Sequence, residues 1–230
     1  MASNLLFVFD FDHTIVDDNT DTWITKLSED VKDIQKASDV CWTDRMNAVF
    51  RKLHEKNFRK LNFDTCLQTL PFSAGMKELL TFILSQGINC IIISDSNTYF
   101  IEYLLSNADL KRVFSEVHTN PAYWNDLEQL CVEYYHNHSC NRCPANLCKG
   151  KVLKTYLEQN NAVDKKVVYV GDGHGDYCPT LQLHGKDYVF ARENYTLLKL
   201  LQRSPPEGKP AVISWNDGFD ILMELKRILN

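Results

Sequence analysis

The segment LLFVFDFD, from Leu5 to Asp12, places two aspartates directly after five consecutive apolar residues. Such a run is typical of a strand that is buried on both faces of a parallel sheet. Two carboxylates at the end of a buried strand repel each other and need a compensating charge. The segment therefore predicts an α/β fold with a charged site where its first strand ends.

The same pattern returns further along the chain. The run INCIIIS ends at Ser94 and is followed by Asp95, while KVVYVGDG leads into a glycine-rich turn that holds Asp172 and Asp176. DYVFA and AVIS read as further short strands, and amphipathic segments with helical spacing separate the strands. Because strands alternate with helices, we predict a Rossmann-like core, a parallel sheet flanked by helices.

One long block interrupts the alternation. Residues 19–70 contain no comparable strand run, and Met46, Val49, Phe50 and Leu53 recur at helical spacing. We therefore predict a helical cap inserted after the first strand. The expected limits are residues 19–70 for the cap, and 1–18 with 71–230 for the catalytic core.

Composition narrows the functional class. The 230 residues carry a net charge of −5, which argues against a nucleic-acid partner. No apolar stretch reaches the ~20 residues that span a bilayer, and the N-terminal segment lacks the cationic start of a signal peptide. We expect a cytoplasmic protein with a small-molecule partner and no membrane contact.

The polar strand ends predict a metal site. Ligands bind at the carboxyl ends of parallel strands, so the four aspartates Asp10, Asp12, Asp172 and Asp176 can share one crevice. Mg²⁺ suits a site that combines few carboxylates with water and phosphate. Lys149 offers a cation that keeps Asp10 ionised and neutralises an incoming phosphate.

These residues resemble the signatures of the haloacid dehalogenase superfamily. DFDHT matches its D-x-D-x-T motif, Ser94 its second motif, Lys149 its third and GDGHGD its fourth, in the family's order. Lys151 is a rival for the third motif. The resemblance covers nearly the whole chain and implies a phosphatase with a cap in the position used by the phosphoserine-phosphatase-like branch.

The resemblance also implies roles. Asp10 is expected to attack phosphorus and form an aspartyl-phosphate, and Asp12 to act as general acid and then general base. Mg²⁺ is expected on Asp10, the backbone carbonyl of Asp12 and Asp172. Ser94 and Lys149 are expected to bind the phosphoryl oxygens, and Asp176 to support the metal through water or to orient Lys149.

A narrower resemblance points to substrates. FDFDHTIVDDNTDTWI, IISDSNTYFIE, CNRCPANLCKGKVL and YVGDGHGDYCP are similar to phosphatases acting on phosphoethanolamine and phosphocholine, and to a sister branch acting on pyridoxal phosphate. DDNTDTW is slightly closer to the second branch. Asp21 and Asp95 take positions that bind substrate in that family, where a carboxylate suits an ammonium group. Trp23 or Tyr99 could add a cation–π face.

Other interpretations are weaker. D-x-D also begins an EF-hand calcium loop, but Ile15 stands where that loop needs glycine, and a strand precedes it instead of a helix. A phosphoryl-transferring mutase would need a second phosphate site, and the cap shows no obvious basic cluster. A non-enzymatic binding protein would not need both Asp10 and Asp12.

The sequence alone leaves more than one role for the segment HNHSCNRCPANLC. Its histidines and Cys140, Cys143 and Cys148 could bind zinc, but we find no clear second, well-separated ligand pair. A redox pair is a further alternative, although no thioredoxin-like helix start follows. We interpret the three cysteines as free thiols near the rim of the active site.

Overall fold

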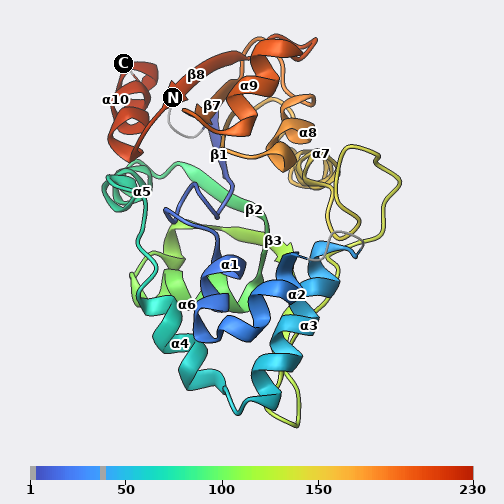
Figure 1. Ribbon diagram of the computed structural model, residues 1–230. Helices are drawn as coiled ribbons and strands as arrows, with labels where there is room; N and C mark the ends of the chain where they lie inside the picture. The colour runs from blue at the N-terminus through green and yellow to red at the C-terminus, as the bar shows by residue number, and fades with distance from the viewer. Residues whose placement is uncertain (1–3, 37–39, 230) are drawn as a thin grey trace.

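A six-stranded parallel sheet forms the centre of the protein (Figure 1). The computed structural model describes residues 4–36 and 40–229. The strands run in the order β3-β2-β1-β6-β7-β8. They are β1 (Leu5–Phe9), β2 (Asn89–Asn97), β3 (Glu116–Asn120), β6 (Lys166–Gly171), β7 (Tyr188–Arg192) and β8 (Ala211–Trp215). The predicted Rossmann-like fold is confirmed.

Helices cover both faces of this sheet, because alternate residues of each strand point to opposite sides. Phe7 and Phe9 of β1 belong to the core that contains α5 (Met76–Ser85) and α10 (Gly218–Leu229). Leu6 and Val8 belong to a second core, with α7 (Lys149–Gln159) and α9 (Thr196–Arg203). The burial of β1 on both faces explains why its sequence is wholly apolar.

A helical region follows β1 and lies below the sheet in Figure 1. It contains α1 (Thr20–Ile24), α2 (Lys32–Lys36), α3 (Trp42–Glu55) and α4 (Lys60–Gln68), with the 3-10 turns η2 (Thr25–Leu27) and η3 (Glu29–Val31). The helix α6 (Thr98–Asn107), which follows β2, packs against α4. This is the cap expected after the first strand, and we keep the limits 19–70 for the cap, and 1–18 with 71–230 for the core, as our proposal.

Three strands were not predicted. β3 follows the turn η4 (Lys111–Val113) at the edge of the sheet, and β4 (Ala122–Trp124) pairs antiparallel with β5 (Leu130–Val132). β2 also continues past Ser94 to Asn97, so the expectation that this strand ends at Ser94 is wrong. Its backbone stays extended and pairs Asn97 with Asn120 after a shift in register.

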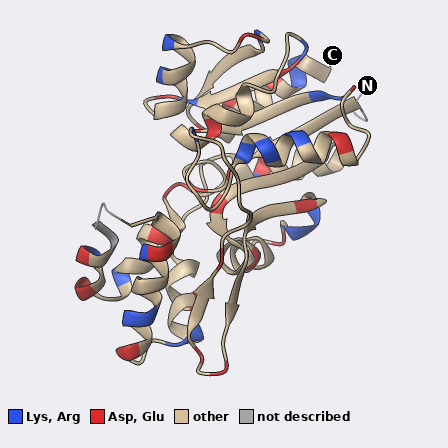
Figure 2. Cartoon of the chain, turned by 90° about the vertical axis from the view of Figure 1, so that its right-hand side faces the viewer, with Lys and Arg blue, Asp and Glu red and all other residues tan. Residues whose placement is uncertain are grey.

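The surface and the helices give two further observations. Figure 2 shows basic and acidic residues interspersed over the chain in that view. Among the described residues, none of the helices combines the length and the apolar character needed to cross a membrane.

Asn47 of the cap makes two hydrogen bonds to the hairpin β4–β5. Asn47 of α3 donates from Nδ2 to the carbonyl oxygen of Val132 at 2.7 Å and accepts from the Val132 N–H at 2.9 Å. Asn47→Ala leaves both groups of a buried residue without this partner, so we expect the free energy of unfolding to fall by about 1–3 kcal/mol. Urea denaturation measures the change.

A matched control distinguishes the loss of these hydrogen bonds from the general effect of replacing an asparagine with alanine. Asn160 is exposed, and its Nδ2 donates only to the carbonyl of Tyr156 one turn earlier. Asn160→Ala is expected to change the unfolding free energy by less than about 0.5 kcal/mol. Equal effects of the two substitutions would contradict the anchoring role of Asn47.

Candidate active site

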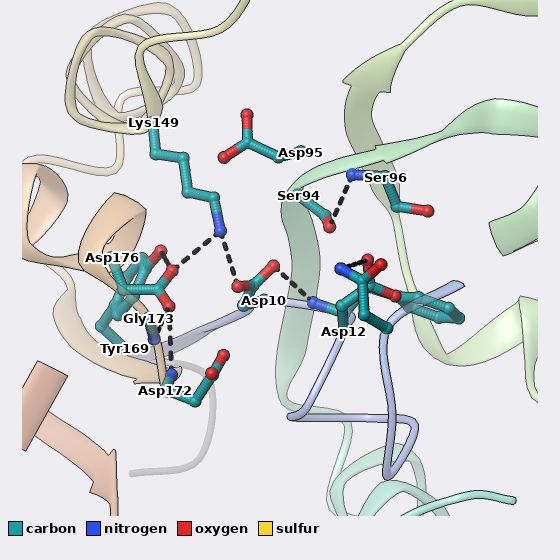
Figure 3. Close-up of polar contacts among 12 residues, drawn as sticks. Asp10, Asp12, Ser94, Asp95, Ser96, Lys149, Tyr169, Asp172, Gly173 and Asp176 are labelled. Atoms are coloured by element: carbon teal, nitrogen blue, oxygen red, sulfur yellow. Dashed lines mark hydrogen bonds and ion pairs between the residues drawn. The ribbon is translucent and has the colours of Figure 1, made fainter. Parts of the chain in front are cut away.

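The carboxyl ends of β1, β2 and β6 bring the polar residues that follow or end these strands into one crevice (Figure 3). The Lys149 ammonium reaches into it from the first turn of α7, because Lys149 is the first residue of that helix. Its Nζ lies 2.7 Å from Asp10 Oδ2 and 2.9 Å from Asp176 Oδ1. All three side chains are buried.

Asp176 uses both carboxylate oxygens within the protein. Oδ1 accepts from Lys149 and from the Tyr169 hydroxyl at 2.7 Å, and Oδ2 accepts from the backbone N–H groups of Asp172 and Gly173 at 3.0 and 2.9 Å. This carboxylate therefore fixes both the ammonium and the turn after β6.

Gly171 makes room for that carboxylate. A Cβ on Gly171 would stand 2.5 Å from Cγ of Asp176, closer than any real contact. The positive-φ glycines of the described chain are Gly75 and Gly87, so the requirement at Gly171 is close approach.

The carboxylates outnumber the ammonium, and their pKa values reflect it. Burial, and next the repulsion from Asp176, raises the pKa of Asp10 to about 7 in spite of Lys149. Burial, then Asp176 and Asp10, raises the pKa of Asp172 to about 9. Burial would raise the pKa of Asp176 too, but Lys149 and the hydrogen bonds outweigh it and lower that pKa.

The donor set fits a hard divalent cation. Carboxylate oxygens of Asp10, Asp172 and Asp176 lie within 4.8 Å of one another. Since Asp176 is fully hydrogen bonded, the carboxylates of Asp10 and Asp172 are the better placed direct ligands. Oxygen-only ligands on few carboxylates are what Mg²⁺ takes, and a cation there would return both groups to the ionised state.

Asp12 lies beyond Asp10, on the cap side of the crevice. Its Oδ1 accepts from the backbone N–H of Thr20 at 2.9 Å, and its Oδ2 accepts from Thr20 Oγ1 and Asn19 Nδ2, each at 3.1 Å. Burial, followed by repulsion from Asp21, raises the pKa of Asp12 well above its usual range. A carboxyl group whose pKa is raised is a candidate general acid.

Ser94 and Ser96 of β2 have different hydrogen bonds. Ser94 Oγ accepts from the Ser96 N–H at 3.2 Å, so that its own hydrogen can be given to a phosphoryl oxygen. Ser96 Oγ lies 2.8 Å from Thr20 Oγ1. Because Thr20 donates to Asp12, Ser96 donates to Thr20, and this chain of hydroxyls orients the Asp12 carboxyl.

Asp21 and Asp95 line one small cavity between the sheet and the cap. The other described lining residues are Thr43, Met46, Ser96, Asn97, Asn120 and Val132, and none of them is a lysine or arginine. Asp21 accepts from Trp42 Nε1 at 2.6 Å, and Asp95 Oδ1 accepts from Asn146 Nδ2 at 3.2 Å. Burial, with a further contribution from Asp95, raises the pKa of Asp21 to about 6 against the Trp42 hydrogen bond.

Several side chains considered in the sequence lie elsewhere. Lys151 is exposed and donates to the carbonyl of Asn137, whereas Lys149 is in the crevice. The Trp23 indole donates to Cys66, and the Tyr99 hydroxyl donates to Asp64. Trp42 is the aromatic residue that meets Asp21.

Other residues of the site escaped prediction. They are Asn19, Thr20, Ser96, Asn146 and Tyr169, all hydrogen bonded to an aspartate of the crevice or to its hydroxyl chain. Only Asn19 had a local signal, because asparagine before a helical segment is a common N-cap, and it caps α1.

Comparisons with known proteins agree with this geometry. A family model described as Putative Phosphatase matches residues 5–229. The human pyridoxal phosphate phosphatase PHOSPHO2 is 41% identical, over 98% of each chain. The human phosphoethanolamine/phosphocholine phosphatase is 33% identical, over 99% of this chain and 90% of that protein. The chain is thus similar to both branches that the sequence motifs indicated.

A solved structure supports the fold. A substrate-bound phosphoserine phosphatase complex superimposes with a TM-score of 0.65 at 17% identity, over 95% of this chain and 97% of that one. The similarity covers the cap as well as the sheet.

Proposed function

The chain belongs to the Putative Phosphatase family, within the haloacid dehalogenase superfamily, and is a phosphoric monoester hydrolase; on this premise we propose that its substrate is a small phosphate ester with a cationic nitrogen. Pyridoxal 5'-phosphate is our first candidate, since the relative named for that substrate is 41% identical. Phosphoethanolamine and phosphocholine are the second.

The cavity beside the phosphate site carries this proposal. Two buried carboxylates, Asp21 and Asp95, line it, and among the residues that the structure describes no basic side chain does. A protonated pyridine nitrogen or an alkylammonium would balance these charges, whereas an anionic leaving group would be repelled.

We assign the first chemical step to Asp10 and Asp12. A carboxylate oxygen of Asp10 forms a bond to phosphorus while the bond from phosphorus to the ester oxygen breaks. The electron pair leaves with that oxygen, which takes the proton of the Asp12 carboxyl. Lys149 and Ser94 hold the phosphoryl oxygens during the transfer.

In the second step Asp12 acts as a general base. The Asp12 carboxylate accepts a proton from water, the water oxygen bonds to phosphorus, and the bond from phosphorus to Asp10 breaks. Phosphate leaves, and Asp10 and Asp12 regain their starting states. Asp176 takes no proton in either step, because Lys149, Tyr169 and two backbone N–H groups hold its charge.

Mg²⁺ is the proposed cofactor, and Asp10, Asp172 and the backbone carbonyl of Asp12 would hold it. Once bound, the ion supplies positive charge to the equatorial phosphoryl oxygens. We place Asp176 behind Lys149 as a positioning residue.

The mutase alternative is less well supported. A mutase must bind a second phosphate group, and the cavity next to the first phosphate site offers two carboxylates. Hydrolysis needs only water there. The non-enzymatic alternative does not fit a family of phosphatases.

We further propose a cytoplasmic enzyme that acts on small molecules without nucleic acid or membrane. None of the eight cysteines is in a disulfide, as expected in a reducing compartment.

A substrate panel tests the proposed function. We expect kcat/KM to be highest for pyridoxal 5'-phosphate, followed by phosphoethanolamine and phosphocholine, and lower for glucose 6-phosphate and p-nitrophenyl phosphate, which carry no cationic nitrogen. Preference for a neutral or anionic ester would contradict the role of the acidic cavity.

Asp21→Asn refines the same experiment. Losing a charge-assisted contact worth about 1.5–3 kcal/mol should lower kcat/KM for the cationic ester by about 10- to 100-fold, with little change for p-nitrophenyl phosphate. Asp21 is ionised above its pKa of about 6 and neutral below it. The wild-type advantage over Asp21→Asn should therefore vanish as the pH falls below 6, and an advantage that persists at pH 5 would contradict charge recognition.

Substitutions of the two catalytic aspartates should change the kinetics in different ways. Asp10→Asn is expected to abolish phosphate release from every ester while the melting temperature stays close to wild type. Asp12→Asn should slow both steps by about 10²- to 10⁴-fold, because it removes the general acid and base. Rapid-quench kinetics with a labelled ester separate formation from breakdown of the phosphoenzyme, and turnover by Asp10→Asn would rule out the covalent route.

Metal dependence gives an independent check. Chelation should remove activity, and Mg²⁺ alone should restore it. Asp172→Asn should raise the Mg²⁺ concentration for half-maximal rate by about tenfold or more. Glu193→Gln serves as the matched control, because Glu193 is half-buried, follows β7 and accepts from Ser214 Oγ. Full activity in chelator would remove the metal from the mechanism.

A further inference from the structure

Four cysteines from three segments of the chain converge beside the active site. Cys140 and Cys143 lie in the loop between β5 and α7 (residues 133–148), drawn in yellow at the right of Figure 1. Cys148 is the N-cap of α7, and Cys178 lies in α8 (Tyr177–Thr180). Their Sγ atoms all lie within 4.8 Å of one another, and none is in a disulfide.

The sulfur spacing is that of a tetrahedral metal site. Cys178 Sγ is 3.8 Å from Cys140 Sγ and 3.9 Å from Cys148 Sγ, and Cys143 contacts both Cys178 and Cys148. A Zn–S bond is about 2.3 Å long, which places tetrahedral sulfur ligands about 3.8 Å apart. A disulfide would require about 2.05 Å.

The separate second pair that the sequence did not reveal is Cys148 with Cys178. Cys178 lies thirty residues beyond Cys148, in the short helix α8 after the turn that follows β6. The remaining cysteines, Cys41, Cys66, Cys90 and Cys131, are free and outside this group.

The neighbouring histidines form hydrogen bonds with the backbone of the loop. His138 Nδ1 accepts from the Cys140 N–H, so its Nε2 carries the hydrogen that it donates to the Pro144 carbonyl. His136 Nε2 accepts from the Cys148 N–H at 3.2 Å. The histidines therefore shape the loop, and the ligand set is four sulfurs.

The backbone around the sulfurs is built for close approach. A Cβ on Gly150 would lie 2.7 Å from Cys178 Sγ and 3.0 Å from the Cys178 carbonyl oxygen, so only glycine lets α7 and α8 meet here. The Lys151 N–H donates to Cys148 Sγ at 3.4 Å. Backbone donors of this kind orient and stabilise a metal-bound thiolate.

We propose that Cys140, Cys143, Cys148 and Cys178 bind one Zn²⁺ in a closed structural site, distinct from the Mg²⁺ site of the proposed function. Four thiolates in a closed tetrahedron suit zinc, which needs no redox chemistry to hold them. Metal binding releases the thiol protons to solvent and leaves the oxidation states unchanged.

The position of the site indicates a structural role for the ion near the phosphate site. Cys148 precedes Lys149, and Cys178 follows Asp176 by two residues, so the ion ties together the two backbone segments that carry the buried ion pair. The same loop carries Asn146, which donates to Asp95. The zinc site thus acts as a positioning element for the phosphate site and for the acidic cavity.

Metal analysis of the full chain tests the proposal. Protein purified under reducing conditions without added metal should contain one zinc per chain. After removal of the zinc, titration with Co²⁺ should give thiolate-to-cobalt charge-transfer bands and the intense visible bands of tetrahedral cobalt. An oxygen site such as the aspartate cluster gives no thiolate bands, so the spectrum distinguishes the two sites.

Variants locate the site. Cys143→Ser should lose the stoichiometric zinc, the thiolate bands and the fall in melting temperature that a strong chelator causes in the wild type. Cys131→Ser is the matched control, since Cys131 is also half-buried and free but lies outside the group, and it should keep all three.

Wild-type protein alone can overturn the proposal. Absence of both zinc and cobalt bands, iron in place of zinc, or a disulfide among these cysteines in unreduced protein would each do so. Stoichiometric zinc that persists in Cys143→Ser to the same extent as in Cys131→Ser would do so as well. These readouts do not depend on which phosphate ester is hydrolysed.

Discussion

The Lys149 ammonium is buried between Asp10 and Asp176, with 2.7 and 2.9 Å contacts, and the rest of the site is arranged around it. One ammonium balances one carboxylate, and hydrogen bonds hold the charge of Asp176. Asp10 and Asp172 are left with pKa values of about 7 and about 9. The crevice thus lacks positive charge, which the proposed divalent cation would supply. The site would then be neutral and could accept a phosphate dianion.

Much of this fold could be predicted because burial on both faces makes a strand uniformly apolar. β1 and the first part of β2 are the clearest examples. β3 escaped because an edge strand is half-exposed, and its sequence EVHTN carries no apolar run. β4 and β5 have three residues each and are held by Asn47 from another element, so that no local pattern could have indicated them.

The residues of the site likewise fall into those that a local sequence pattern predicts and those that depend on tertiary packing. Asp10, Asp12, Ser94 and Asp172 could be expected together because parallel strands end at one edge of the sheet. The hydrogen-bond partners of Asp12, Asp95 and Asp176 could not. Thr20, Asn146 and Tyr169 reach these aspartates only through tertiary packing. Trp42 rather than Trp23 meets Asp21 for the same reason: helix packing, and not sequence distance, decides which indole reaches that carboxylate.

A buried ion pair stabilises a protein only when its geometry is held closely, because each desolvated charge is costly without its partner. The strand β6 and its turn fix Asp176 from one side through the N–H groups of Asp172 and Gly173. Lys149 has no strand behind it, only the start of α7 and a long loop without regular structure. A metal ion on Cys148 and Cys178 would join these two supports within a few residues of each charge. Such a link explains why a loop of this length can end in a side chain on which phosphate chemistry depends.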